Sequence, residues 1–251
     1  MRHFTEEAIQ IIDLGDEPGL VGVKLLMFDV ARLPNDLVFE LGKLLSPPEL
    51  RKAARFRMMK DRKVYLSGGG MLRKMISEVL GPPAADLVIQ EGQYGKPYLA
   101  DGTKQLPFNL SNSGDMVALA FDFGRREIGV DIEKINRSFE YWEVAGHYFS
   151  KKECDRVFNH RDFYRIWTMK EALLKVTGVG LVDDLPMVDL SGKMNRVEIK
   201  DERLLPFKDK AFTIYTFDNE EVVISVAVAG AQLTAAEDTG IKVAHVYFYG
   251  G

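Results

Sequence analysis

The clearest alternation of apolar and polar positions in this chain lies in the segment GVDIEKI, Gly129–Ile135. Its apolar residues Val130 and Ile132 alternate with two carboxylates, Asp131 and Glu133. A period of two predicts a β-strand with one buried face, and residues two apart share a face with their Cβ atoms about 7 Å apart. Two neighbouring carboxylates resist full ionisation unless a positive group lies near both. The pattern therefore predicts a strand with a cation site on one face.

The rest of the pattern predicts a mixture of helices and strands. Apolar residues at three- and four-residue spacings predict helices at 35–45, 49–80 and 141–175. Alternating or short apolar runs predict strands at 21–30, 108–111, 116–123, 128–133, 211–217, 221–229 and 241–249. The turn GRRE between the strands 116–123 and 128–133 predicts that these two form an antiparallel hairpin. This order of elements is typical of an α+β protein, and two similar halves meeting near residue 123 are compatible with it.

Composition and charge exclude several classes of protein. The 251 residues are 46% hydrophobic and 28% charged, as in ordinary soluble globular proteins. The net charge of −4 argues against general affinity for nucleic acid or anionic membrane, and the longest apolar run, 222–231, is too short to span a bilayer. The single cysteine, Cys154, excludes an intramolecular disulfide and a cysteine-built zinc site. With acidic Glu6 and Glu7 where a signal peptide has an apolar core, we expect a cytoplasmic protein.

A second candidate segment is the helical stretch FYRIWTMKEALLKVTGVGL. Trp167, Glu171 and Lys175 are four residues apart and therefore form one stripe on a helix. An isolated Glu–Lys pair at this spacing is typically a surface ion pair worth a few tenths of a kcal/mol. The large apolar residues of this helix argue against a polar outer surface, and the turn Gly178–Gly180 lets a ligand approach the backbone. We therefore predict that this stripe belongs to a site.

Glu171 is the third carboxylate needed to complete the site on the strand. Together with Asp131 and Glu133 it makes an all-oxygen ligand set, which suits Mg²⁺ or Mn²⁺. Mg²⁺ binds few protein carboxylates and typically completes its octahedron with water and phosphate oxygens. The three acids therefore predict a substrate that contains phosphate.

These segments resemble the signature of the 4′-phosphopantetheinyl transferases. That signature is G-[IV]-D-[IVL]-E followed, after about 35 to 40 residues, by W-x-x-K-E-x-x-x-K, and all its fixed positions are present in GVDIEKI and WTMKEALLK. Three further blocks resemble upstream motifs of the family: SPPELRKAARF (46–56), YGKPYL (94–99) and FNLSNSG (108–114). The length resembles that of the family's long single-chain type, the type of the surfactin-synthetase activator.

The resemblance implies a fold and an activity. The fold would be a pseudodimer of two similar α/β halves with the site at their interface, and the protein would act as a monomer. Residues 1–122 would be the half that holds the adenine and 3′-phosphate side of coenzyme A, and residues 123–251 the half with the metal and catalytic motifs. The activity would be Mg²⁺-dependent transfer (Mn²⁺ being the alternative metal) of 4′-phosphopantetheine from coenzyme A to a serine of an acyl or peptidyl carrier protein, releasing 3′,5′-ADP.

The resemblance also implies roles for the residues of the signature. Asp131, Glu133 and Glu171 would hold the metal on the pyrophosphate of coenzyme A, Glu133 either directly or through a water molecule. Lys175 would contact the phosphate and stabilise or protonate the leaving group. Glu171, or a water molecule that it orients, and Glu153 are the two candidates for deprotonating the serine of the carrier protein.

Coenzyme A contacts are implied at further positions. Lys96 aligns with a lysine beside the adenine, Lys52 with a contact to the 3′-phosphate, Ser111 with a contact to the pyrophosphate, and Lys170 with a lysine near coenzyme A. The basic run 51–63 has seven basic residues against one acid. It is either a solvated helix face or a surface toward the phosphates of coenzyme A and the acidic surface of a carrier protein.

The chain departs from the family pattern around the 3′-phosphate. Asn112 replaces a histidine and cannot become positively charged, so we expect it to weaken the binding of coenzyme A without abolishing it. Val64 and Tyr65 replace small polar or basic residues, and Glu49 replaces a basic one. Arg62 and its neighbour Lys63 are close enough in the sequence to compensate.

Two other functions are compatible with part of this pattern. Metal-dependent nucleases also combine carboxylates with a lysine in D…E-x-K, but here Lys134 follows Glu133 directly and the chain is acidic. A non-catalytic paralogue that binds coenzyme A or a carrier protein would explain Asn112. The complete set of three acids and Lys175 favours the transferase.

Overall fold

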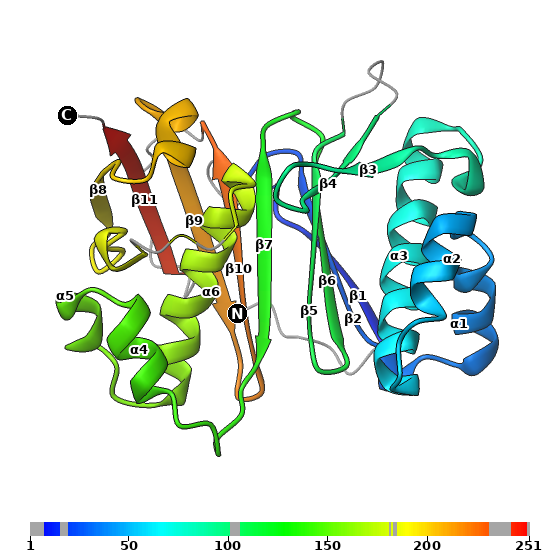
Figure 1. Cartoon of the computed structure of the whole chain (residues 1–251), viewed down its shortest axis with the longest axis horizontal. Coiled ribbons are helices and arrows are strands. Elements are labelled where there is room, and N and C mark those ends of the chain that lie inside the picture. Colours follow the sequence, from blue (N-terminus) through cyan, green and yellow to red (C-terminus); the bar gives the residue numbers. More distant parts are fainter. Residues whose placement is uncertain are drawn as a thin grey trace.

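The computed structural model describes residues 8–15, 20–100, 106–180, 182, 185–230 and 242–249, the last segment with the side chain of Val246 only. The described residues form two large sheets, each with helices on one side, and a small two-stranded sheet (Figure 1). Within the described residues, none of the helices is both long and apolar enough to cross a membrane.

The first sheet is antiparallel and is built from residues up to 122. Its order is β1-β2-β6-β5, with β1 Ile9–Asp13, β2 Val23–Asp29, β6 Met116–Asp122 and β5 Phe108–Ser113. Between β2 and β5 the chain forms α1 Asn35–Gly42, α2 Pro47–Ala53, α3 Met59–Leu80 and a small two-stranded sheet of β3 Ile89–Glu91 and β4 Pro97–Leu99. Short 3₁₀ turns lie at Val30–Arg32 and Ala84–Asp86.

The second sheet follows in the chain and has the order β7-β10-β9-β11-β8. Its strands are β7 Ile128–Lys134, β10 Val222–Ala229, β9 Ala211–Asp218, β11 Lys242–Tyr249 and β8 Met194–Glu198, and only β8 and β11 run parallel. Its helices are α4 Trp142–Tyr148, α5 Lys151–Cys154 and α6 His160–Thr177, with 3₁₀ turns at Leu185–Met187 and Glu202–Phe207.

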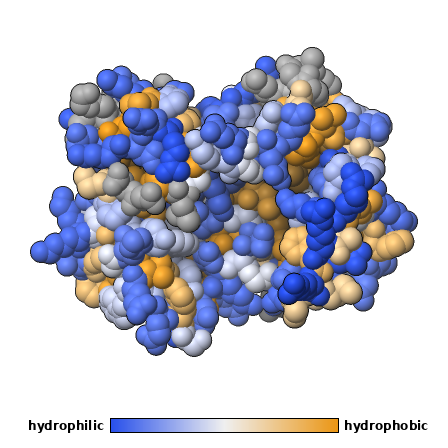
Figure 2. All heavy atoms as spheres, viewed as in Figure 1, coloured by the Kyte–Doolittle hydropathy of each residue, from blue (hydrophilic) through white to orange (hydrophobic). Residues whose placement is uncertain are grey.

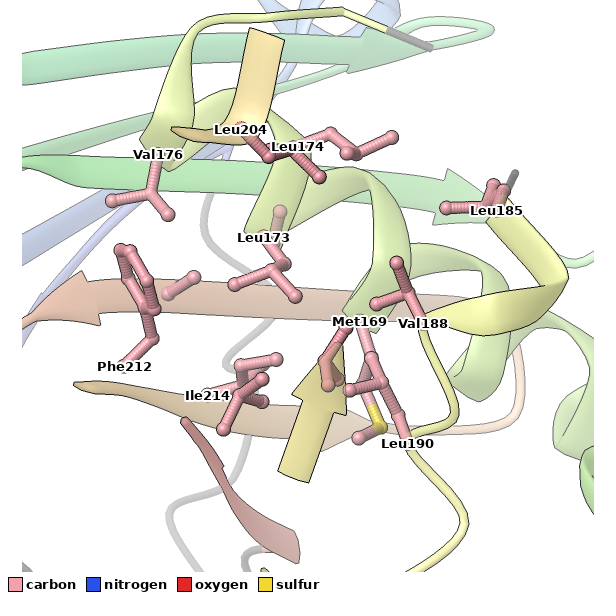
Figure 3. Packing of buried hydrophobic residues seen from close by; sticks show 14 of the residues in the cluster. Met169, Leu173, Leu174, Val176, Leu185, Val188, Leu190, Leu204, Phe212 and Ile214 are labelled. Atoms are coloured by element: carbon pink, nitrogen blue, oxygen red, sulfur yellow. The ribbon is translucent and has the colours of Figure 1, made fainter. Parts of the chain in front are cut away.

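Three buried clusters join these elements into four layers, helix, sheet, sheet and helix. One cluster lies between α1, α3 and the first sheet, a second joins the inner faces of β2 and β6 to those of β7 and β10, and a third lies between α6 and the second sheet. In the third cluster Leu173 and Val176 of α6 face Phe212 and Ile214 of β9 (Figure 3). Each strand of the central layers therefore sends alternate side chains to opposite layers.

This layering places the carboxylates of β7. Val130 and Ile132 are buried in the cluster between the sheets. Asp131 and Glu133 consequently point to the opposite face of β7, the face that contacts α6. The predicted strand and its two-faced pattern are confirmed, and the mixed α+β class is confirmed with them.

The predicted hairpin between 116–123 and 128–133 is wrong. Strand β6 pairs with β2 and β5, whereas β7 pairs with β10 in the other sheet. The chain crosses between the sheets at a compact link in which the fully buried carboxylate of Asp122 accepts hydrogen bonds from Gly124 N (2.7 Å) and Arg126 Nε (2.6 Å). The hairpin in this region is β5–β6 instead, and β5 extends to Ser113, past the expected end of its strand at 111.

Two predicted helices are divided in the structure. The segment 49–80 forms α2 and α3 because the chain leaves helical geometry after Ala54, and the ring of Phe56 turns back onto Tyr65 with 5.3 Å between centroids. The segment 141–175 forms α4, α5 and α6, and new helices begin at the N-caps Ser150 and Asn159. The short strands β1, β3, β4 and β8 were not predicted.

The closest approach between β7 and α6 is at Gly129. A Cβ atom there would lie 2.2 Å from the carbonyl oxygen of Ala172 and 2.4 Å from the amide nitrogen of Val176. Both are backbone atoms of α6 and cannot rotate away. Glycine at position 129 therefore sets the distance between the strand with two of the acids and the helix with the third.

We expect Gly129→Ala to lower the free energy of unfolding by about 1–3 kcal/mol, because the added methyl group forces α6 away from β7. The matched control is Gly146→Ala in α4, where nothing lies within 4 Å of the added Cβ and alanine favours the helix. Urea unfolding followed by circular dichroism measures both. Equal stability of the Gly129→Ala variant and the parent would show that this contact does not set the spacing.

Candidate active site

The carboxylates of β7 and the stripe of α6 come together at one place. Lys175 Nζ lies 2.6 Å from Asp131 Oδ1 and 2.8 Å from Ser111 Oγ on β5, and Ser111 Oγ donates to Asp131 Oδ1 at 2.9 Å. Glu171 lies one helical turn before Lys175, and its electrostatic interactions include Asp131, Lys175 and Glu133. The structure thus brings Asp131, Glu133, Glu171, Lys175 and Ser111 close together. That they bind a metal and coenzyme A stays a prediction.

Polar side chains of β5 join the two sheets at this site. Strand β7 pairs with β10 along one edge, and along its other edge alternate backbone N–H groups donate to side chains of β5. These hydrogen bonds are Val130 N to Asn109 Oδ1 (2.8 Å), Ile132 N to Ser111 Oγ (3.4 Å) and Lys134 N to Ser113 Oγ (3.1 Å). The backbone N–H groups along this edge of β7 therefore donate to side chains of β5 instead of to the backbone carbonyl groups of a paired strand.

Two of these side chains also hold the carboxylates. Ser111 binds Asp131, as described above, and Ser113 Oγ donates to Glu133 Oε2 at 2.6 Å. Trp167 of the α6 stripe also lies near Glu133 and has a lowering effect on its pKa, smaller than that of Ser113. Roles for Asn109 and Ser113 were not predicted, although polar residues at every second position of FNLSNS indicate a polar strand face.

Burial dominates the electrostatics of the three acids. It raises the pKa of Asp131 and of Glu133 above their ordinary values, against the lowering effect of Lys175 and of the serine hydroxyls. Burial, followed by the charge of Asp131, raises the pKa of Glu171 from 4.5 to about 7. Each of these acids is therefore held in an environment that disfavours its charged form.

The donor set fits a hard divalent cation. Asp131 Oδ2 and Glu171 Oε1 are buried oxygen atoms of the site, and no group among the described residues forms a hydrogen bond with either. Within the described residues no three Asp, Glu, His or Cys side chains are yet arranged as a formed metal centre. The positive charge beside Asp131 is instead the ammonium group of Lys175. Two unsatisfied buried carboxylate oxygens nevertheless match the oxygen ligands that Mg²⁺ and Mn²⁺ prefer.

Glu153 and Lys170 lie elsewhere, as a fully buried ion pair. Lys170 Nζ lies 2.9 Å from Glu153 Oε2 and donates to the carbonyl oxygens of Leu185 (3.0 Å) and Val188 (2.6 Å), while Glu153 Oε1 accepts from Leu190 N (2.8 Å). The pair fastens the segment 185–190 to α5 and α6. A contact of either side chain with coenzyme A or with a serine would require this pair to open.

A cavity of about 490 Å³ lies on the other side of β5, bounded by α2, α3, β3 and β4. In the space-filling view the face between the α1–α3 end and the middle of the molecule is hollowed, with apolar atoms inside (Figure 2). Lys52 and Asn112, two of the residues expected to contact coenzyme A, line this cavity. The cavity is within the size range of small-molecule sites, and its walls were not predictable from the sequence.

Two other predicted contacts lie outside that cavity. Lys96 Nζ binds Glu127 Oε2 (2.9 Å) and the carbonyl oxygen of Val176 (3.2 Å), so it joins the first half of the chain to the end of α6. The side chain of Arg62 is exposed on the first turn of α3 and is not part of the cavity wall. Its neighbour Lys63 donates to Asn35 Oδ1 at 2.8 Å. Arg62 therefore does not join Lys52 in the described cavity wall.

The raised pKa of Glu171 predicts how stability depends on pH. Since its folded-state pKa of about 7 exceeds the ordinary 4.5, the folded protein binds this proton more tightly, and this contribution to stability is lost as the pH rises toward and through 7. In EDTA at pH 8, Glu171→Gln should therefore unfold with a free energy about 1–3 kcal/mol higher than the parent, and the difference should vanish near pH 4. Urea unfolding at each pH measures it.

The control for this experiment is Glu78→Gln, which removes an exposed carboxylate paired with Lys74 on α3. Its effect should be small and nearly independent of pH. A Glu171→Gln variant less stable than the parent at pH 8 would contradict the proposed unfavourable burial of this carboxylate.

Comparison with known proteins identifies the family. A family model described as 4′-phosphopantetheinyl transferase, N-terminal, matches residues 34–123, and that of the 4′-phosphopantetheinyl transferase superfamily matches residues 127–227. The chain is 29% identical to the 4′-phosphopantetheinyl transferase HetI of Nostoc sp. over 78% of this chain and 84% of HetI. It is 35% identical to the 4′-phosphopantetheinyl transferase ffp of Bacillus subtilis over 62% and 69% of the two chains.

A third relative is the mouse L-aminoadipate-semialdehyde dehydrogenase-phosphopantetheinyl transferase, with 31% identity over 65% of this chain. The match spans only 58% of that longer protein. The two family models together match strands of both sheets, although not β1, β2 or β11, and the second model contains all three acids and Lys175. The chain belongs to the 4′-phosphopantetheinyl transferase superfamily.

Proposed function

We propose that this protein transfers the 4′-phosphopantetheine group of coenzyme A to a serine hydroxyl of an acyl or peptidyl carrier protein. The serine oxygen forms a bond to the phosphorus of the pantetheine arm, and the bond from that phosphorus to the bridging oxygen of the pyrophosphate breaks, so that 3′,5′-ADP leaves. The observation that supports this most directly is the convergence of Asp131, Glu133, Glu171 and Lys175 where β7 faces α6 and β5.

The roles of the individual residues follow from their positions. Asp131, Glu133 and Glu171 would hold Mg²⁺ or Mn²⁺, which when bound neutralises charge on the diphosphate. The ammonium of Lys175 lies at the same place and can donate to a phosphate oxygen or to the leaving group. Glu171, or a water molecule that it orients, is the acceptor for the serine proton.

We further propose that the chain is a pseudodimer of two halves, 1–122 and 123–251, with the site between them. The topology supports this, because in each half a strand is followed by helices and then by a hairpin. In each half the first strand pairs with the second strand of the hairpin, giving β2-β6-β5 and β7-β10-β9. Since one chain supplies both halves, a monomer is sufficient for activity.

The decisive assay incubates the protein with coenzyme A, Mg²⁺ and an apo carrier protein, and measures the mass of the carrier. We expect a mass gain of one phosphopantetheine group that is prevented by EDTA. Asp131→Asn and Glu171→Gln should each lower the rate about 100-fold or more, because they remove a charged ligand oxygen from the site. Glu78→Gln should leave the rate unchanged.

The possible outcomes separate the functions that the sequence leaves open. A protein that binds coenzyme A in a titration but modifies no carrier is a binding paralogue. Transfer at near-parental rates by Asp131→Asn or Glu171→Gln would instead contradict the assignment of the metal-binding residues while leaving the activity intact.

A further inference from the structure

The cavity behind β5 adjoins the proposed active site. Asn112 lines the cavity and follows directly after Ser111, which binds Asp131 and Lys175. Because neighbouring residues of a strand point to opposite faces, the cavity and the carboxylates lie on the two faces of one strand. A ligand whose diphosphate lies at the carboxylates can therefore extend around the edge of β5 into this volume.

The charged groups in the cavity wall are mostly acidic. Three carboxylates, those of Glu49, Asp61 and Glu91, line the cavity together with a single basic side chain, that of Lys52. Lys52 Nζ already forms an ion pair with Glu91 Oε1 at 3.1 Å. The wall described by the structure therefore has no surplus of positive charge.

Two further cations near the cavity, Arg73 and Lys63, are occupied as well. Arg73 is almost completely buried, and its guanidinium binds Glu49 Oε2 (2.8 Å) and the carbonyl oxygens of Ala84 (2.7 Å) and Leu87 (3.0 Å). Arg73 thus neutralises Glu49 from behind the wall and does not itself line the cavity. Lys63, which could have compensated, binds Asn35 instead.

The remaining polar groups of the wall are neutral. Burial, with the charges of Glu49 and Glu91, raises the pKa of Tyr65 to about 12, so its hydroxyl group stays protonated and can donate a hydrogen bond. Asn112 contributes an amide. The other walls are apolar, with Val64, Leu72 and Leu110 among them. Such a cavity suits a flat, uncharged ring and does not offer the cations that a phosphate monoester requires.

We propose that the nucleotide end of the donor enters this cavity and that its 3′-phosphate contributes little to binding, so that 3′-dephospho-coenzyme A is a donor about as good as coenzyme A. This inference rests on the proposed function. A phosphate monoester has a charge of about −1.5 to −2 at pH 7, and here it meets carboxylates and one neutralised lysine. Removing that phosphate leaves a ribose hydroxyl, and no strong contact between protein and donor is lost.

The test compares kcat/KM for coenzyme A and 3′-dephospho-coenzyme A with the same apo carrier protein and Mg²⁺ concentration. We expect values within about threefold of each other, corresponding to less than 1 kcal/mol of discrimination. A preference for coenzyme A of more than tenfold would overturn the inference. If neither donor supports transfer, the proposed function fails. The dissociation constants of the two donors, measured by calorimetry, then decide the inference, with the same threefold and tenfold limits on their ratio.

A variant tests the physical cause. Glu91→Gln removes the partner of Lys52 and frees its ammonium for the 3′-phosphate, so the preference for coenzyme A over 3′-dephospho-coenzyme A should rise about fivefold. The control Glu78→Gln removes an exposed carboxylate remote from the cavity wall and should not change the ratio. A Glu91→Gln variant with an unchanged ratio would show that the ion pair does not suppress recognition of the phosphate.

Discussion

The site depends on which groups accept hydrogen bonds from the backbone N–H groups along the edge of β7 that faces β5. A strand edge presents backbone N–H groups that need acceptors, and here the side chains of Asn109, Ser111 and Ser113 provide them. Because the same serine hydroxyls bind Asp131 and Glu133, the contact that joins the two sheets is also the contact that orients the acids. A continuous ladder of backbone hydrogen bonds would have joined the sheets without placing any side chain beside the carboxylates.

Two groups of buried charges in this protein differ in how completely they are satisfied. Lys170 has three acceptors for its three N–H groups, and both oxygens of Glu153 accept hydrogen bonds, so this pair has the features of a structural ion pair. In the site, by contrast, the part of the chain that the structure describes offers no hydrogen-bond partner to Asp131 Oδ2 or Glu171 Oε1. Carboxylates held in this way reduce stability and are typical of a site prepared for a ligand.

The sequence predicts those parts of the site that depend on short-range periodicity. The period of two places Asp131 and Glu133 on one face, and the spacing of four places Glu171 and Lys175 together. Lys170 is adjacent to Glu171 in the motif, and the family motif therefore assigns it to the site. On the helix, however, its side chain points about 100° away from that of Glu171, and it is buried in the core. Contacts between residues far apart in the sequence leave no short-range pattern. The pairing of β7 with β10 and the ion pair of Lys52 with Glu91 could therefore not be predicted from periodicity.

Because of the distribution of charge in the protein, its strongest ionic interactions with the donor would be at the reacting diphosphate. In the cavity, the carboxylates of Glu49 and Glu91 already have cationic partners within the protein, so a ligand there gains little from its own charge. At the site, unpaired carboxylate oxygens and the ammonium of Lys175 surround the place where the diphosphate would be bound. Interactions at the reacting phosphorus can strengthen in the transition state, whereas uniform contacts with a remote phosphate only tighten ground-state binding. Weak ionic contacts at the nucleotide end are therefore compatible with efficient transfer.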